Sequence, residues 1–188
     1  MKTLILNGSP HPNGDTAKLL HRLVEQLEGE YRIYNAYTAK LSPCMDCRAC
    51  RKQDGCVIQD EMQEIYAYLT ECDHILIASP VYFSELTGKL LDLASRLQRY
   101  FNARVYLGKE PLSKPKRGAI LLVGGGMGKM EKAINTATIL LHQMQCQTIL
   151  PPVISAHTDC VPAIEDPIAC EGIRQIAAFF HAAQDSLG

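Results

Sequence analysis

The segment SPCMDCRACRKQDGCVIQDEM, residues 42–62, contains four closely spaced cysteines: Cys44, Cys47, Cys50 and Cys56. Their spacing, C-x2-C-x2-C-x5-C, is typical of a tight loop that wraps thiolates around a [4Fe–4S] cluster, although the last gap is long and no proline follows. Two alternatives stay open. Four thiolates can bind zinc tetrahedrally, although structural zinc sites more often use two separated pairs, and the thiols can also act without a metal.

A second candidate site begins with the loop NGSPHPNGDTAKL, residues 7–19, which offers hydroxyls and an amide where a helix is expected to begin. Unpaired N–H groups at a helix start attract phosphate. The loop is neither G-x-G-x-x-G nor a P-loop, and a simple turn rich in glycine and proline explains it equally well.

Two further loops could complete a pocket for a planar ligand. SPVYFSELTGKLL, residues 79–91, sets Tyr82 and Phe83 just beyond an apolar run, where they either wall a heterocycle or cap the core. VGGGMGKM, residues 123–130, lets backbone approach a ligand at Gly124, Gly125 and Gly126. Past the last predicted strand, His157 and Asp159 either border this site or belong to a surface loop.

The elements that must position these loops alternate along the chain. Apolar runs predict strands over residues 2–7, 31–38, 74–80, 117–125 and 146–153, and helical periodicity predicts helices over 16–29, 60–72, 88–101, 129–144 and 168–184. This alternation predicts a parallel sheet covered by helices on both faces, with ligands bound at the carboxyl ends of its strands. The loops after the first, third and fourth strands should therefore converge.

Length and composition restrict the classes of function. We expect 188 residues to form one domain, residues 1–188, with the cysteine-rich loop at about 42–58. Nineteen Lys and Arg against 20 Asp and Glu leave no broad cationic surface, so we expect no nucleic-acid partner. The absence of a long apolar run or signal-peptide core predicts no membrane association and a cytoplasmic location, where structural disulfides are rare. Cys72 and Cys146, beside predicted strands, are expected to be buried apolar residues.

NGSPHPNGDTAKL, PCMDCRACRKQDGCVIQDEM and ASPVYFSELTGKLLDLASR together resemble the flavodoxin-like NADPH-dependent FMN reductase family, and within it the iron–sulfur flavoproteins. The resemblance implies a three-layer doubly wound fold with a five-stranded parallel sheet in the order 2-1-3-4-5. It also implies FMN as cofactor, NAD(P)H as transient donor, a small-molecule or protein electron acceptor, and a homodimer or dimer of dimers. NADPH and NADH are not distinguished.

The same resemblance implies which residues hold the cofactors. The FMN phosphate would be held by Ser9, His11, Asn13, Asp15 and Thr16; the ribityl chain and ring would be lined by Pro80, Val81, Tyr82 and Phe83; and Gly124, Gly125 and Gly126 would pass near the ring. Cys44, Cys47, Cys50 and Cys56 match the cluster motif of iron–sulfur flavoproteins. No catalytic side chain is implied, because the flavin N5 carries the chemistry.

Three positions depart from the family pattern. His11 stands where relatives commonly carry Arg, and Asp15 stands where they carry Asn. A carboxylate repels phosphate, so we expect Asp15 to accept backbone N–H groups as a helix cap. Ser95 stands where relatives tend to carry Asp before Arg96, which predicts that a family salt bridge is missing.

The function that the resemblance implies is that of an FMN-dependent oxidoreductase, which takes hydride from NAD(P)H and passes electrons to an acceptor, directly or through the cluster. The alternatives are a non-enzymatic flavin-binding module, which would show no turnover with reduced nicotinamides, and a zinc-stabilised interaction module, which would be colourless.

Overall fold

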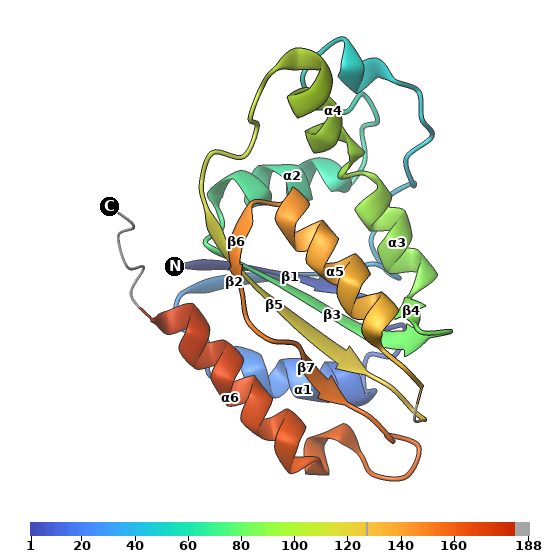
Figure 1. The fold of residues 1–188 in the computed structure, drawn as a ribbon, viewed down its shortest axis with the longest axis vertical. Coiled ribbons are helices and arrows are strands. Elements are labelled where there is room, and N and C mark those ends of the chain that lie inside the picture. Colours follow the sequence, from blue (N-terminus) through green and yellow to red (C-terminus); the bar gives the residue numbers. More distant parts are fainter. Residues whose placement is uncertain (127, 183–188) are drawn as a thin grey trace.

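Helices cover both faces of one sheet in the computed structural model, which describes residues 1–126 and 128–182 (Figure 1). In chain order the elements are β1 (Lys2–Asn7), α1 (Asp15–Val24), β2 (Glu30–Asn35), η1 (Ala49–Arg51), α2 (Met62–Glu71), β3 (His74–Tyr82), β4 (Glu85–Leu86), α3 (Gly88–Ser95), α4 (Gln98–Leu107), β5 (Lys116–Val123), α5 (Glu131–Gln143), β6 (Cys146–Ile149), β7 (Val153–Ser155), η2 (Ala163–Glu165) and α6 (Pro167–His181).

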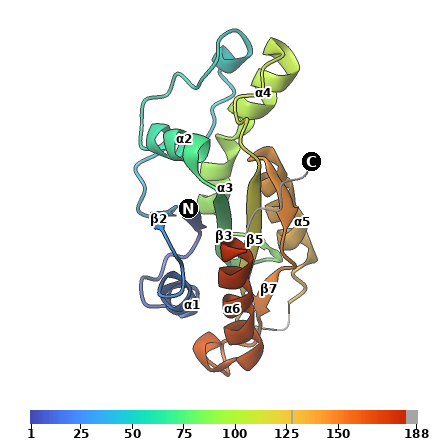
Figure 2. The ribbon, with the colours of Figure 1, turned by 90° about the vertical axis from the view of Figure 1, so that its left-hand side faces the viewer.

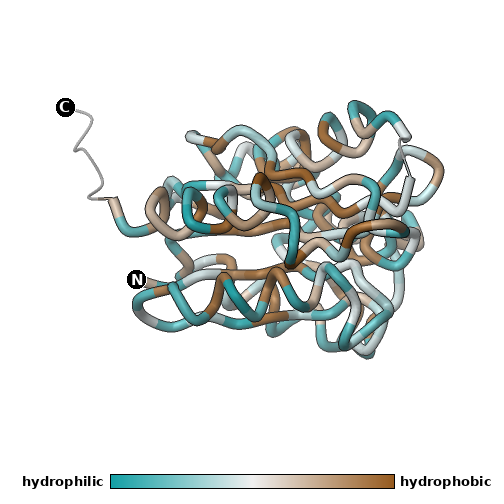
Figure 3. Tube along the Cα trace, turned by 90° about the horizontal axis from the view of Figure 1, so that it is seen from below, coloured by the Kyte–Doolittle hydropathy of each residue, from teal (hydrophilic) through white to brown (hydrophobic). Residues whose placement is uncertain are grey.

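The central strands are buried on both faces, because their side chains alternate between two separate apolar clusters. One face of β1, β3 and β5 packs against α2, α3 and α5, and the opposite face packs against α1 and α6. Neighbours such as Leu4 and Ile5 belong to different clusters, as the two-residue period of a strand requires. Figure 3 shows apolar segments along the centre of the trace and hydrophilic ones on the outer helices. The predicted three-layer α/β fold is confirmed.

The predicted sheet of five strands in the order 2-1-3-4-5 is wrong in detail. Within the described residues the sheet has seven strands, and its continuous path is β2-β1-β3-β5-β6. The short β4 pairs antiparallel with the end of β3. The expected strand over residues 146–153 is divided into β6 and β7, which pair with different parts of β5, because Pro151 and Pro152 have no N–H to donate to a ladder.

The helix expected over residues 88–101 is also divided, into α3 and α4. Between them Arg96 and Leu97 donate to carbonyls three residues back, at 3.1 and 2.9 Å, in a tightened turn. The Arg96 carbonyl accepts hydrogen bonds from the Tyr66 hydroxyl at 2.7 Å and from the Arg99 amide at 3.4 Å, in place of the four-residue bond of a regular helix. The break turns α4 outward, so that α4 and the cysteine loop project together beyond the layers (Figure 2).

The other predicted elements differ from the structure only at their ends. The first helix ends at Val24 rather than residue 29, and β2 ends at Asn35 rather than residue 38. The last helix begins at Pro167, capped by the Asp166 carboxylate, and residues 183 and 184 of its predicted range lie outside the described residues. Among the helices described, none has the length and apolar character needed to cross a membrane.

Candidate functional site

The carboxyl ends of β1, β3 and β5 lie side by side. Asn7 pairs with Ala78, and Pro80 pairs with Val123, so the loops that follow these strands leave the sheet at one edge. The Gly8 amide donates to the Ala78 carbonyl at 2.8 Å. The predicted convergence of the three loops is therefore present in the fold.

The first loop is held tightly against the start of α3. The Thr87 hydroxyl donates to the Gly8 carbonyl at 2.8 Å, and a Cβ on Gly8 would approach the Ser79 and Thr87 hydroxyl oxygens to 2.8 Å. Only glycine fits at this position without displacing a neighbour. The next residue, Ser9, is buried and donates its N–H to the Asn7 amide oxygen at 2.9 Å.

The start of α1 has unpaired donors. Its N-cap is Gly14, which has no side chain to accept from the first N–H groups of the helix. Thr16 is buried there, and His11 and Asn13 are exposed. This arrangement suits an anion, because the first N–H groups of a helix point toward its N-terminal end.

Asp15 accepts a backbone N–H, but not as a cap of α1. Its Oδ1 accepts from the Ala163 amide of η2 at 2.9 Å, so the predicted helix cap is wrong. The carboxylate instead joins the first helix to the loop before α6. The side chain of the first residue of α1 is thus occupied by a tertiary contact, which the local sequence does not indicate.

The second loop presents exposed aromatics from a strained turn. Tyr82 pairs with Glu85 across the β3–β4 hairpin, and its two central residues, Phe83 and Ser84, have φ values of 52° and 63°. Such two-residue turns normally use Asn and Gly, because these residues tolerate positive φ better than residues with larger side chains. Phe83 is fully exposed and Tyr82 is 43% exposed. Pro80 and Val81, half-buried at the end of β3, lead into the turn.

The third loop packs against the loop after β7. The Gly124 carbonyl accepts from Thr158 at 3.1 Å, and the Gly125 carbonyl accepts from Asp159 at 3.2 Å. A Cβ on Gly125 would lie within 2.6 Å of both Asp159 carboxylate oxygens. Gly126 is exposed, and Met127 lies outside the described residues. Asp159 therefore lies against the glycine loop, and whether it borders a bound ligand stays a prediction.

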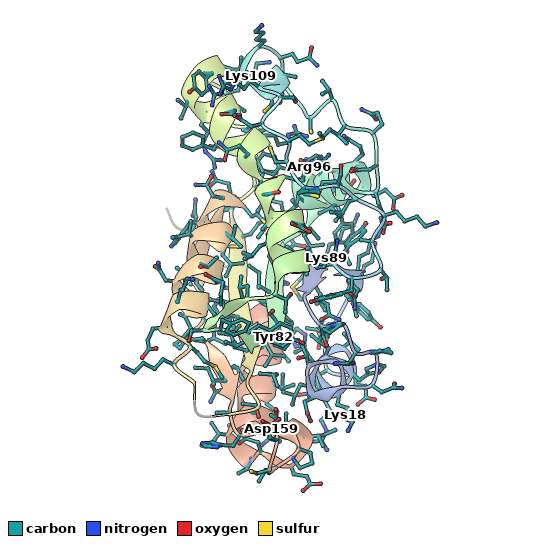
Figure 4. All side chains as sticks on the ribbon, turned by 90° about the vertical axis from the view of Figure 1, so that its right-hand side faces the viewer. Lys18, Tyr82, Lys89, Arg96, Lys109 and Asp159 are labelled. Carbon is teal, nitrogen blue, oxygen red and sulfur yellow. The ribbon has the colours of Figure 1, made fainter. Side chains whose placement is uncertain are left out.

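The four loop cysteines line one pocket, together with Arg96, Arg99 and Asn102 among others. Figure 4 shows Arg96 well separated along the long axis from Tyr82 and Asp159. The predicted site residues therefore form two groups within the chain, one at the strand ends and one between the cysteine loop and α4.

Two donors that sequence reasoning missed contact the cysteine sulfurs. Arg96 Nη2 lies 3.4 Å from Cys56 Sγ, and Asn102 Nδ2 lies 3.1 Å from Cys50 Sγ. Both come from the α3–α4 region, 40 and 52 positions further along the chain than their partners, and no local pattern marks them.

Arg96 ties both ends of the cysteine loop to the helices. Its guanidinium donates to the Ser42 carbonyl at 2.9 Å, to the Asp60 carboxylate at 2.7 Å and to the Ile58 carbonyl at 3.3 Å. Arg96 therefore has an ion pair in spite of the serine before it. Ser95 itself accepts the Cys44 amide at 2.9 Å. Burial opposes the charge of Arg96, but its hydrogen bond to Asp60 and its interactions with Tyr66 and Cys56 outweigh that effect and raise its pKa.

The chemistry of the pocket fits an anionic group with sulfur acceptors. The Nε groups of Arg96 and Arg99 are buried without a hydrogen-bond partner. Among the described residues, no three Cys, His, Asp or Glu side chains are grouped to hold a single ion, whereas tetrahedral zinc needs sulfurs about 2.3 Å from one point. A cubane cluster would take one thiolate on each of its four irons, and the four cysteines that line the pocket match that number.

The remaining cysteines are not part of this pocket. All eight cysteines lie within the described residues and are free thiols. Cys72 and Cys146 are buried, as predicted, and burial raises the pKa of the Cys72 thiol to about 11. Cys160 is exposed and Cys170 is half-buried.

Comparison with known proteins extends these observations. The family model described as NADPH-dependent FMN reductase matches residues 1–159. An iron–sulfur flavoprotein of Methanosarcina thermophila is 33% identical over 147 residues, which are 76% of this chain and 73% of that protein. An iron–sulfur flavoprotein of Archaeoglobus fulgidus is 30% identical over 135 residues, 70% of this chain, but the match spans only 58% of that relative's length.

Solved structures show the same fold at low sequence identity. An NAD(P)H:quinone oxidoreductase from Methanothermobacter marburgensis matches with a TM-score of 0.71 and 13% identity, covering 97% of this chain and 98% of the other. An FMN-dependent NADH-azoreductase from Bacillus anthracis, in complex with FMN, matches with a TM-score of 0.68 and 16% identity, covering 96% and 99%. These likenesses establish the flavodoxin-like architecture.

Proposed function

The chain belongs to the NADPH-dependent FMN reductase family, and on that premise we propose that it passes electrons from NAD(P)H and FMN to a small acceptor or redox partner through a [4Fe–4S] cluster. As a member of this family it is an oxidoreductase that uses FMN with a reduced nicotinamide as donor. When bound, the flavin accepts hydride and releases electrons singly or in pairs. The protein binds and orients the flavin.

One observation carries the flavin proposal: three loops meet where β1, β3 and β5 end. Ser9, His11, Asn13 and Thr16, with the uncapped start of α1, would hold the phosphate. Asp15 would not bind the anion, because its carboxylate accepts the Ala163 amide and so holds the start of α1 against η2.

The other two loops would hold the ribityl chain and the ring. Pro80 and Val81 would line the ribityl chain, and the exposed rings of Tyr82 and Phe83 would cover an apolar heterocycle. Gly124, Gly125 and Gly126 would allow the backbone to lie against the ring edge. We assign no general acid or base, because hydride transfer to a flavin needs position and electrostatics from the protein.

The cysteine pocket is the basis of the cluster proposal. Cys44, Cys47, Cys50 and Cys56 would each bind one iron, and a bound cluster would relay single electrons. Support comes from the common pocket, the two N–H donors on sulfur and the unpaired guanidinium N–H groups that line it.

The decisive experiment is a visible spectrum of protein purified without oxygen, combined with iron, sulfide, zinc and FMN analysis. We expect flavin bands with a broad iron–sulfur shoulder. Cys47→Ser should lose iron and sulfide but keep FMN, whereas Cys160→Ser, which removes an exposed thiol outside the pocket, should keep the iron, the sulfide and the FMN.

Flavin without iron would contradict the cluster and leave a flavin reductase that works without one. Bound zinc without flavin would favour an interaction module, and flavin without nicotinamide turnover would favour a non-enzymatic binding module.

We further propose a homodimer or dimer of dimers in the cytoplasm. Exposed apolar side chains on α4 and the adjacent loop, Met45, Val57, Phe101, Val105 and Tyr106, offer a surface that a second copy could cover. Eight free thiols suit a reducing compartment. Light scattering of the purified protein tests the assembly, and a monomeric mass would contradict it.

A further inference from the structure

Two of the four cysteine sulfurs have N–H donors contributed by the helices. Asn102 is 2% exposed, and its Nδ2 donates to Cys50 Sγ at 3.1 Å. Arg96 is 1% exposed, and its Nη2 donates to Cys56 Sγ at 3.4 Å. The N–H groups are thus held against sulfur away from bulk water, where a hydrogen bond is electrostatically stronger.

Further hydrogen bonds hold the Arg96 side chain in place. Nη1 of Arg96 is bonded to the Asp60 carboxylate and the Ser42 carbonyl, and these bonds fix the plane of the guanidinium. Asn102 lies in α4 with its Oδ1 buried and without a partner. A buried carbonyl oxygen left unpaired is costly, so the position of Asn102 is not explained by stability alone.

We propose that Arg96 and Asn102 are positioning residues that raise the reduction potential of the cluster held by the four cysteines, an inference that rests on the proposed function. Reduction adds one electron, and therefore one negative charge, to the cluster and its thiolates. N–H donors on the sulfurs stabilise that added charge, and hydrogen bonds to sulfur are among the established determinants of cluster potential. The electron comes from the reduced flavin, and no bond is made or broken at either residue.

Asn102→Leu is the sharpest variant, because leucine has a similar volume and removes both the donor and the unpaired oxygen. A purely structural role predicts lower stability. Our inference predicts unchanged or higher stability together with a lower potential. At the midpoint potential of the wild-type cluster, the ratio of reduced to oxidised cluster should fall about tenfold, which is 59 mV for a one-electron couple. A redox titration of the holoprotein, followed by the electron paramagnetic resonance signal of the reduced cluster, measures this ratio.

Arg96→Lys provides a second test that keeps the positive charge but loses the planar donor fork. We expect the same direction of shift. Arg48→Gln is the matched control, since Arg48 also lines the pocket but its side chain is 63% exposed and pairs with Asp46. Removing this screened charge should change the ratio less than twofold.

Unchanged ratios in both Asn102→Leu and Arg96→Lys, with iron and sulfide retained, would overturn the inference. An equal shift in Arg48→Gln would also overturn it, because net charge rather than the hydrogen bonds would then be responsible. Wild-type protein without iron and sulfide would refute the proposed cluster, and with it this inference. Metal analysis of the wild type separates that failure from the first two.

Discussion

Arg96 and Asp60 form a buried ion pair in which Nη1 and Oδ2 are 2.7 Å apart, with no exposure of the Arg96 side chain and 14% exposure of Asp60. The pair joins the α3–α4 junction to the residues just before α2, where the cysteine loop ends. Burial opposes ionisation of Asp60, but the bonds from Arg96 and from the Ser42 and Met62 amides prevail and lower its pKa. We therefore expect this contact to hold the end of the cysteine loop in place.

Asp60→Asn should lower the free energy of unfolding by about 3–5 kcal/mol, because it leaves the Arg96 charge buried without its partner. Urea denaturation at neutral pH measures the change. Lys89→Gln is the control: Lys89 pairs with Asp92 at 3.5 Å with both side chains exposed, and its loss should cost less than about 1 kcal/mol. Equal losses in the two variants would show that the buried Arg96–Asp60 pair stabilises the protein no more than the exposed Lys89–Asp92 pair does.

Gly8→Ala should weaken FMN binding and lower the free energy of unfolding by about 1–3 kcal/mol, because the added methyl overlaps Ser79, Thr87 and Leu90 atoms less than 3 Å away. Flavin fluorescence titration and urea denaturation test both parts. In Gly88→Ala, by contrast, the methyl meets nothing within 4 Å at the start of α3, so stability should rise by up to about 1 kcal/mol. If Gly8→Ala binds FMN as wild type does, the tight first loop is unrelated to the flavin.

Replacing the β3–β4 turn with Phe83→Asn and Ser84→Gly should stabilise the FMN-free protein by about 1 kcal/mol, because these residues tolerate the positive φ of both positions. FMN affinity should fall, since the exposed ring is lost. Phe83→Ala separates the two effects: it removes the ring but keeps a side chain at positive φ. We expect weaker FMN binding in both variants but higher stability only in the double variant. Unchanged affinity in both would exclude Phe83 from the flavin site.

His74 should make the protein less stable in mild acid. Its buried ring stacks on Phe180 with centroids 4.6 Å apart, and burial lowers its pKa from 6.5 to about 4. Between about pH 6.5 and 4, His74 is protonated in the unfolded chain but neutral in the folded chain. The contribution of neutral His74 to folding stability is therefore complete above about pH 6.5 and falls as pH drops toward 4.

His74→Phe, which keeps an aromatic ring against Phe180, should remove this pH dependence. Between about pH 7.5 and pH 5, wild type should lose about 2 kcal/mol more unfolding free energy than the variant. Denaturation curves at the two pH values provide the comparison. A parallel loss in both proteins would assign the acid sensitivity to carboxylates instead.

The order of elements and the converging loops could be predicted from the sequence, because apolar runs, helical periodicity and glycine-rich turns are local properties of the chain. The burial of β1, β3 and β5 between two helical layers follows from the same patterns. The spacing of Cys44, Cys47, Cys50 and Cys56 likewise indicates thiolate chemistry without any fold. The division of the strand over residues 146–153 could also have been predicted from Pro151 and Pro152, since proline has no N–H to donate to a neighbouring strand.

Only the tertiary structure decided which distant groups meet those residues. Asp15 bonds Ala163 rather than capping its own helix, and the sulfurs of Cys50 and Cys56 receive N–H groups from Asn102 and Arg96. At the break between α3 and α4, the Arg96 carbonyl accepts from the Tyr66 hydroxyl, thirty positions earlier. Local pattern limits which backbone conformations a segment adopts, but the partners of a buried polar group are set by the packing of whole elements, which brings groups distant in sequence within hydrogen-bond distance.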